Sequence, residues 1–183
     1  MLRPLEVANV FSPEECSEII AAAHPQAFAE AGLVAGRKAD GIRRARIAWL
    51  DETKDGAWIF RRLLETVNAA NREYFHFDLE EFGERMQVAW YVAEAQGFFD
   101  WHSDIGQGLL ASRRKLTIVI QLSDPGSYQG GDLEINADGN VYRATRACGS
   151  AVLMPSFVLH RVTPVTRNSR FSLTLWAHGP HFH

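Results

Sequence analysis

The pattern of the chain changes near residue 84, and this change constrains the fold more than any other feature of the sequence. Beyond it, short runs rich in apolar and β-branched residues are separated by turn signals such as Asp124-Pro125-Gly126 and Gly130-Gly131. A series of short strands of this kind predicts two sheets packed face to face, as a sandwich or a barrel-like jelly roll. The expected strands cover residues 86–93, 98–102, 116–122, 132–135, 151–154, 158–162 and 171–176.

Two helices are expected ahead of the β region. Ser12-Pro13-Glu14-Glu15 has the pattern of a capping box with proline at the first helical position, and the apolar residues that follow predict a helix ending near His24-Pro25. From Ala57 to Tyr74, apolar residues recur at helical spacing. Between the helices we expect a short strand at 44–50 and a glycine-rich, charged loop at 32–41. The prediction is an α+β protein, mainly β, with its N-terminal helices packed on one sheet.

Length and charge narrow the range of functions. One domain is expected to take up all 183 residues, with a helical part over about 1–84 and a β core over about 85–178. A formal net charge of -3 offers no broad basic field for nucleic acid or an anionic membrane, and no run is long enough to span a bilayer. Pro4 and Glu6 interrupt the first residues before an apolar segment can develop, so no secretory signal is expected. Two cysteines, whose pairing the sequence leaves open, favour a reduced, cytoplasmic setting.

His102 and Asp104 are the first candidate metal ligands. They lie two residues apart at the end of an expected strand, where such side chains project from the same face. Alone, this pair is weak evidence for metal binding, because most such pairs lie in surface loops or are hydrogen-bonded core groups. His160 could supply a third ligand, since a polar residue inside the apolar run 158–162 would need a partner. Two histidines and one carboxylate form the facial triad of non-haem iron(II) oxygenases, whereas zinc favours a closed or singly open tetrahedral site.

Arg170 adds a second signal, ten residues after His160. A guanidinium at the start of the last strand could hold a carboxylate through two parallel hydrogen bonds, which lysine cannot reproduce. Ser172, on the same face, could add a hydroxyl donor. Alone, Arg170 would be interpreted as a surface or edge-strand charge. Together with the triad, it predicts an anchor for a carboxylate.

These residues resemble the prolyl-hydroxylase-type (PKHD-type) branch of the iron(II)/2-oxoglutarate-dependent dioxygenases, a double-stranded β-helix family. The resemblance runs from about Gln87 to Trp176, and residues 10–16 resemble the helix that opens such domains. Arg170 stands where collagen-type prolyl hydroxylases usually carry lysine, so a collagen-like substrate is not implied. The matching segments are Tyr91, 99–104, 114–117, 121–123, 128–133, 149–151, 160–166 and Arg170.

The resemblance implies roles for particular residues. His102, Asp104 and His160 would bind the catalytic Fe(II), and Arg170 would bind the distal carboxylate of 2-oxoglutarate with help from Tyr91 and Ser172. Dioxygen would be the other co-substrate, and ascorbate a further cofactor. The implied reaction is hydroxylation of a C–H bond. The leading substrate is a prolyl residue in a protein or peptide. A free amino acid or small metabolite is the alternative substrate.

A different class of function also fits the fold, because double-stranded β-helices serve as non-catalytic binding or sensing modules. The intact set of candidate ligands argues against that reading. Demethylation of nucleic acid bases is disfavoured by the net charge of -3 and the lack of a basic stripe.

Other residues keep two interpretations. Trp90 and Trp176 could line a substrate groove, but aromatic residues in β-type runs are more often core, and Trp101 is expected to pack behind the site. Residues 105–114 fit either a lid or an ordinary surface connection. The basic run 113–115 is expected to be a solvated loop. A solvated tail is favoured over a second metal site for His178, His181 and His183.

Overall fold

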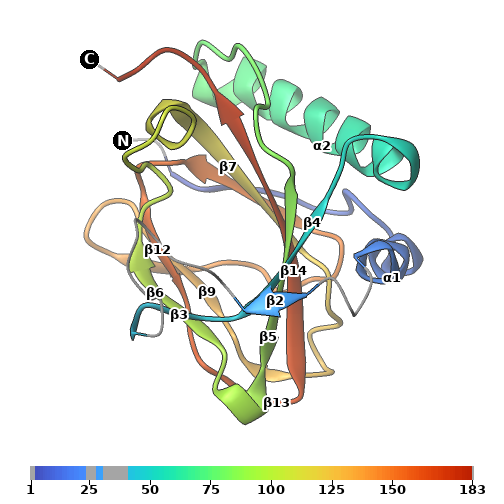
Figure 1. Ribbon diagram of the computed structural model, residues 1–183. Helices are drawn as coiled ribbons and strands as arrows, with labels where there is room; N and C mark the ends of the chain where they lie inside the picture. The colour runs from blue at the N-terminus through green and yellow to red at the C-terminus, as the bar shows by residue number, and fades with distance from the viewer. Residues whose placement is uncertain (1–2, 24–27, 31–40, 183) are drawn as a thin grey trace.

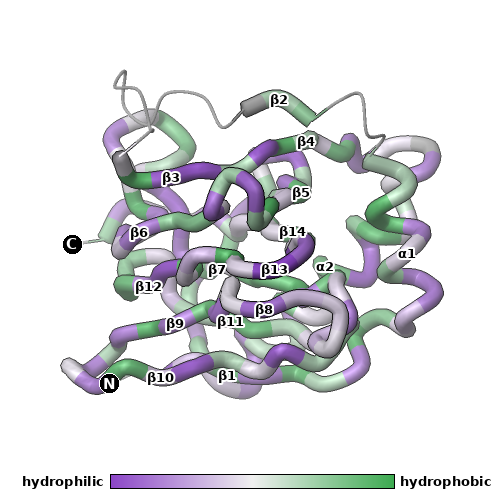
Figure 2. Tube along the Cα trace, turned by 90° about the horizontal axis from the view of Figure 1, so that it is seen from below, coloured by the Kyte–Doolittle hydropathy of each residue, from purple (hydrophilic) through white to green (hydrophobic). Residues whose placement is uncertain are grey.

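Two antiparallel sheets form the body of the protein (Figure 1). The structure, a computed structural model, describes residues 3–23, 28–30 and 41–182. The larger sheet has seven strands in the order β1-β11-β7-β14-β5-β4-β2, the smaller has five in the order β10-β9-β12-β6-β3, and β13 pairs with β8. Figure 2 shows the strands of the smaller sheet one above another, beside those of the larger sheet. The expected double sheet is confirmed.

All seven expected strands are present. The expected strand at 44–50 is divided, because β3 joins the smaller sheet and β4 joins the larger one. The larger sheet consists of β1 (Leu5–Val7), β2 (Ala29–Glu30), β4 (Arg46–Leu50), β5 (Met86–Val92), β7 (Arg114–Gln121), β11 (Ala151–Pro155) and β14 (Ser169–His178). The smaller sheet consists of β3 (Arg43–Arg44), β6 (Phe98–His102), β9 (Leu133–Asn136), β10 (Val141–Arg143) and β12 (Leu159–Val162), and the separate pair is β8 (Gln129–Gly130) with β13 (Val165–Arg167).

Both predicted helices form. The α1 helix (Pro13–Ala22) begins with the expected capping box, since the Ser12 hydroxyl accepts from the Glu15 N–H at 3.2 Å and the Glu15 carboxylate accepts from the Ser12 N–H at 2.9 Å. The α2 helix (Ala57–Ala70) continues into one π-helical turn. The predicted helix end at His24-Pro25 and most of the predicted loop at 32–41 lie outside the described residues. Among those that are described, no helix is both long and apolar enough to cross a membrane.

The core has two parts, one on each face of the larger sheet. Alternation along β14 sends Leu173 and Leu175 toward the helices and leaves Arg170 and Ser172 facing the smaller sheet. Cys16 lies in the helix-side cluster as a free thiol. That cluster includes Ile19, Ile59, Leu63, Val67, Val88, Ile118, Ile120 and Leu153, and the cluster between the sheets includes Tyr91, Val119, Leu133, Ile135, Val152, Met154 and Val162. Polar side chains on the inner face are therefore enclosed between the sheets.

Candidate active site

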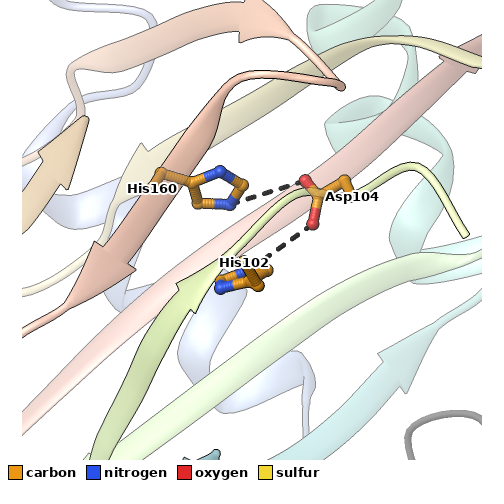
Figure 3. Close-up of side chains that lie close together, drawn as sticks. All are labelled: His102, Asp104 and His160. Atoms are coloured by element: carbon orange, nitrogen blue, oxygen red, sulfur yellow. Dashed lines mark ion pairs between the residues drawn. The ribbon is translucent and has the colours of Figure 1, made fainter. Parts of the chain in front are cut away.

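His102, Asp104 and His160 meet between the two sheets (Figure 3). His102 is the last residue of β6, and His160 is its direct cross-strand partner on β12. Asp104 follows β6 by two residues, and its carboxylate oxygens lie 3.6 Å from Nε2 of His102 and 3.7 Å from Nε2 of His160. The three ligand atoms lie within 4.8 Å of one another, so they could bind a single metal ion.

A β-bulge in β6 aims the side chains at the site. His160 pairs with His102, whereas Val162 pairs with Phe99, so three steps along β6 match two steps along β12. The extra residue brings Phe99 and His102 onto the same face, and their rings stack with centroids 3.4 Å apart. The Phe99 ring therefore supports the imidazole of His102 from one side.

Hydrogen bonds from its backbone and its side chain position Asp104. Its N–H donates to the Ser156 carbonyl at 2.8 Å. Its Oδ2 accepts from the Thr117 hydroxyl at 2.7 Å and from the Trp176 indole N–H at 3.0 Å. Strand alternation was expected to place this carboxylate beside His102. Because β6 ends at His102, a hydrogen-bonded loop places it instead.

The histidines offer their Nε2 atoms. Nδ1 of His102 lies 2.7 Å from the Asp100 carbonyl oxygen, and Nδ1 of His160 lies 3.0 Å from that of Val158. A carbonyl oxygen only accepts, so Nδ1 carries the proton and the Nε2 lone pair faces Asp104. Burial, followed by the charge of His160, lowers the pKa of His102 to about 4. Since a metal binds the neutral imidazole, His102 is ready to ligate at neutral pH.

The donor set suits iron(II). Burial raises the pKa of Asp104, but His160 and His102, and then the Trp176 and Thr117 hydrogen bonds, outweigh it and hold this pKa below its usual value. Asp104 is therefore an anionic ligand beside two imidazoles. This is the combination that binds one face of a non-haem iron(II) and leaves three positions for other ligands.

Arg170 is the second functional group of the inner face. It is 1% exposed on β14, opposite Tyr91 on β5. Its Nη2 donates to Oε1 of Gln121 at 2.9 Å, but its Nε and Nη1 are buried without a hydrogen-bond partner in the part of the chain that the structure describes. Leaving buried donors unpaired costs about 1–3 kcal/mol for each group, and more where the group is charged. A carboxylate ligand such as that of 2-oxoglutarate would satisfy them.

The neighbours of Arg170 shape this anchor. The Tyr91 ring centroid lies 5.4 Å from the guanidinium carbon, and Ser172 is buried two residues further along the same face of β14. Gly131 has φ +65°, and a Cβ there would lie only 3.0 Å from Cδ of Arg170. The positive φ suits a glycine, and the missing side chain leaves room for the arginine. Gln121 carried no local signal, because only sheet pairing brings it to Arg170.

The tryptophans were expected either to line a substrate groove or to lie in the core. Trp101 packs against Arg161, with the guanidinium carbon 4.8 Å from its ring centroid. His160, the residue before Arg161, lies with the other two candidate ligands. Trp90 stacks on Phe171 at 5.5 Å, on the helix side of the sheet. Trp176 is buried as expected for a core residue, but its indole N–H also orients Asp104. Its hydrogen bond to the candidate ligand is what the sequence did not reveal.

A partly buried ion-pair network supports the Asp104 loop. Arg114 donates to both carboxylate oxygens of Glu84, at 2.6 and 2.5 Å, and to the backbone carbonyl of Asp104 at 2.9 Å. Its guanidinium also lies 4.0 Å from the Trp176 ring centroid. Nε2 of His178 lies 3.0 Å from the same Glu84 carboxylate. The network thus contacts both the backbone of Asp104 and the indole that orients its side chain.

Two sequence predictions are wrong at this network. Arg114 was expected in a solvated loop and His178 in a solvated tail, but β7 begins at Arg114 and β14 extends to His178, which is fully buried. Both lie close to Glu84, which is distant in sequence. His181 is exposed, as predicted, and His183 lies outside the described residues.

We expect Glu84→Gln to destabilise the protein in a pH-dependent way. Burial raises the pKa of Glu84, but His178 and Arg114 outweigh it and lower this pKa from 4.5 to about 2. A carboxyl group with a lowered folded-state pKa stabilises the fold above its unfolded pKa, and that contribution disappears as the pH falls from 4.5 to 2. The expected loss is about 3 kcal/mol at pH 7, shrinking toward pH 2, in denaturant unfolding. An equal difference at both pH values would contradict this account.

The comparisons with known proteins agree with this geometry. The sequence profile of the 2OG-Fe(II) oxygenase superfamily matches residues 86–178. A PKHD-type hydroxylase of Hyphomonas neptunium is 30% identical over 176 residues, covering 93% of this chain and 75% of the relative. One from Stutzerimonas stutzeri is 28% identical over 178 residues, covering 94% and 76%.

Solved structures support the same fold. A Pseudomonas putida prolyl-4-hydroxylase superposes with a TM-score of 0.74 at 22% identity, covering 97% of this chain and 92% of that one. A prolyl hydroxylase from Trichoplax adhaerens, in complex with a hypoxia inducible factor peptide fragment, superposes with a TM-score of 0.76 at 18% identity. This match covers 96% of this chain and 83% of that one. The profile match and the Hyphomonas relative show that the chain belongs to the 2OG-Fe(II) oxygenase superfamily.

Proposed function

We propose that this protein hydroxylates a C–H bond of a prolyl residue in a protein or peptide, with His102, Asp104 and His160 as the Fe(II) ligands and Arg170 as the anchor for 2-oxoglutarate. Members of the superfamily use Fe(II), 2-oxoglutarate and O2. The observation that carries the proposal is that the inner face combines a facial triad with a buried guanidinium whose Nε and Nη1 have no partner among the described residues. The PKHD-type relatives and prolyl hydroxylase neighbours favour a prolyl substrate.

When bound, the iron would supply the oxidising chemistry. The protein's own part is to bind, orient and exclude water. Thr117 and Trp176 hold Asp104 in one rotamer, while backbone carbonyls fix the proton of each histidine on Nδ1. Arg170, held by Gln121, would orient the distal carboxylate of 2-oxoglutarate, so that its keto acid end points at the metal.

The proposal is tested by succinate formation. The protein is purified anaerobically, loaded with Fe(II) and 2-oxoglutarate, and exposed to O2 with proline-containing peptides or with free amino acids. We expect a prolyl peptide to stimulate succinate release and to become heavier by one oxygen atom. Ascorbate is included in half of the reactions to test whether it sustains turnover.

The other outcomes distinguish the alternatives. Stimulation by free amino acids but by no peptide would replace the proposed substrate with a small metabolite. Absence of succinate under every condition, in protein that retains iron, would favour a non-catalytic binding module. A His102→Ala variant serves as the inactive control, and full activity in that variant would refute the assigned metal site.

A further inference from the structure

Arg43 shares with Arg170 a feature that no other arginine of the described residues has. Both carry a buried guanidinium nitrogen without a hydrogen-bond partner in that part of the chain, and in Arg43 this atom is Nε. The partners missing at Arg170 are explained by a co-substrate carboxylate. The unpaired donor of Arg43 is not explained by any ligand considered so far.

Arg43 lies beside the metal site. On β3 it is the cross-strand partner of Phe99, so the two side chains share the inner face of the smaller sheet. Its guanidinium carbon is 4.5 Å from the Phe99 ring centroid, and the other neighbour of that ring is the His102 imidazole, at 3.4 Å. One aromatic ring therefore separates the guanidinium from a candidate iron ligand.

Gln87 holds the guanidinium from the opposite sheet. Its Oε1 accepts from Nη2 of Arg43 at 2.8 Å, and its side chain is 8% exposed. On β5 it shares the inner face with Tyr91 and is the cross-strand partner of Thr174, two residues before Trp176 on β14. This contact joins the two sheets but is neutral, and no carboxylate among the described residues forms an ion pair with Arg43.

We propose that Arg43, held by Gln87, binds a carboxylate of the primary substrate. This inference rests on the oxygenase activity of the proposed function and specifies the charge of its substrate. A guanidinium presents its Nε and Nη donors side by side, a geometry that matches the two oxygens of a carboxylate. Because Arg43 lies one ring away from His102, that carboxylate belongs within a few bonds of the oxidised carbon. Two sources provide this chemistry: the carboxylate of free proline, or an acidic side chain next to a prolyl residue in a peptide.

Arg43 could instead serve only to tie the sheets together. In that case its replacement would lower stability but would affect acidic and neutral substrates equally. Arg44 provides a matched control, because it is the next residue, pairs with Phe98 and lies 5.5 Å from that ring, yet it is exposed and donates to the Ala95 carbonyl. Removing Arg44 deletes the same charge on the opposite face of the strand.

The direct test follows the Nε–H resonance of Arg43 by NMR. The full-length protein is loaded with diamagnetic Zn(II) and 2-oxoglutarate, so that no turnover occurs, and the signal is assigned by its absence in Arg43→Lys. Two probe pairs are titrated: L-proline with L-prolinamide, and Ac-Asp-Pro-NH2 with Ac-Asn-Pro-NH2. We expect the resonance to move with the carboxylate member of one pair and not with its amide, and the responding pair identifies the source. No movement, or equal movement with acid and amide, overturns the proposal.

Kinetics give an independent reading. With the acid that shifts the resonance as substrate, Arg43→Gln is expected to raise KM at least about tenfold, whereas Arg44→Gln leaves it unchanged. The KM for the matched amide should change little in Arg43→Gln. Equal effects on acid and amide would mean that Arg43 is structural. Failure of the proposed function is separately visible, because the wild-type protein, loaded with Fe(II) and 2-oxoglutarate, would then form no succinate with any of the four probes.

Discussion

Asp104→Ala is expected to lose Fe(II) and to reduce 2-oxoglutarate turnover by more than about 100-fold, which exceeds the usual effect of changing a residue behind a metal ligand. The substitution removes the only anionic ligand of the candidate triad and leaves two neutral imidazoles. It also leaves the Thr117 hydroxyl and the Trp176 N–H without their shared acceptor. Bound iron, measured by elemental analysis, and succinate release should fall together.

Two further variants separate ligation from general damage. Trp176→Phe keeps the aromatic packing but removes the donor to Asp104, so we expect iron affinity to fall about 10- to 100-fold without complete loss. Asp138→Ala removes an exposed carboxylate in the turn between β9 and β10 and should change neither quantity. Retention of stoichiometric iron by Asp104→Ala would show that this carboxylate is not a ligand.

The main strands and both helices could be predicted because their signals are local. The capping box at Ser12 and the apolar, β-branched run at 116–122 are complete within a few residues. The short strands β1, β8, β10 and β13 were not predicted, since two or three residues carry no measurable period. The division of 44–50 between two sheets was also missed, because pairing with β5 or β6 decides it.

In the candidate site, too, local signals could be recognised in the sequence and distant contacts could not. His102, Asp104, His160 and Arg170 could be named as candidates because their residue types and spacing are typical of one chemistry. The structure brings the first three together. Groups recognised only through their contacts were not found: Thr117, Gln121, Glu84 and Gln87 are common polar residues in sequence, and distant strands bring them to their partners. His178 was misread for the same reason, since its partner Glu84 lies 94 residues away.

Arg170→Met is expected to separate co-substrate binding from folding. Without a ligand, the guanidinium of Arg170 is a buried charge, and two of its nitrogens have no partner among residues 3–23, 28–30 and 41–182. An apolar side chain of similar length should therefore leave the apoprotein at least as stable. A ligand that binds only the folded state raises stability, and the gain grows with the logarithm of the ratio of ligand concentration to Kd, so 2-oxoglutarate should raise the Tm of the wild type and not of the variant. The KM for 2-oxoglutarate should rise by about 10-fold or more, because charge-assisted hydrogen bonds are lost.

Two comparisons make this prediction specific. Arg170→Lys keeps the charge but loses the planar pair of donors, so its KM should lie between those of the wild type and Arg170→Met. Arg167→Met removes an exposed arginine just ahead of β14 and should behave as the wild type. Iron content should be unchanged in all three, because none of these residues belongs to the triad. If 2-oxoglutarate still stabilised Arg170→Met as much as the wild type, its carboxylate would have to bind elsewhere, and the unpaired nitrogens of Arg170 would need a different explanation.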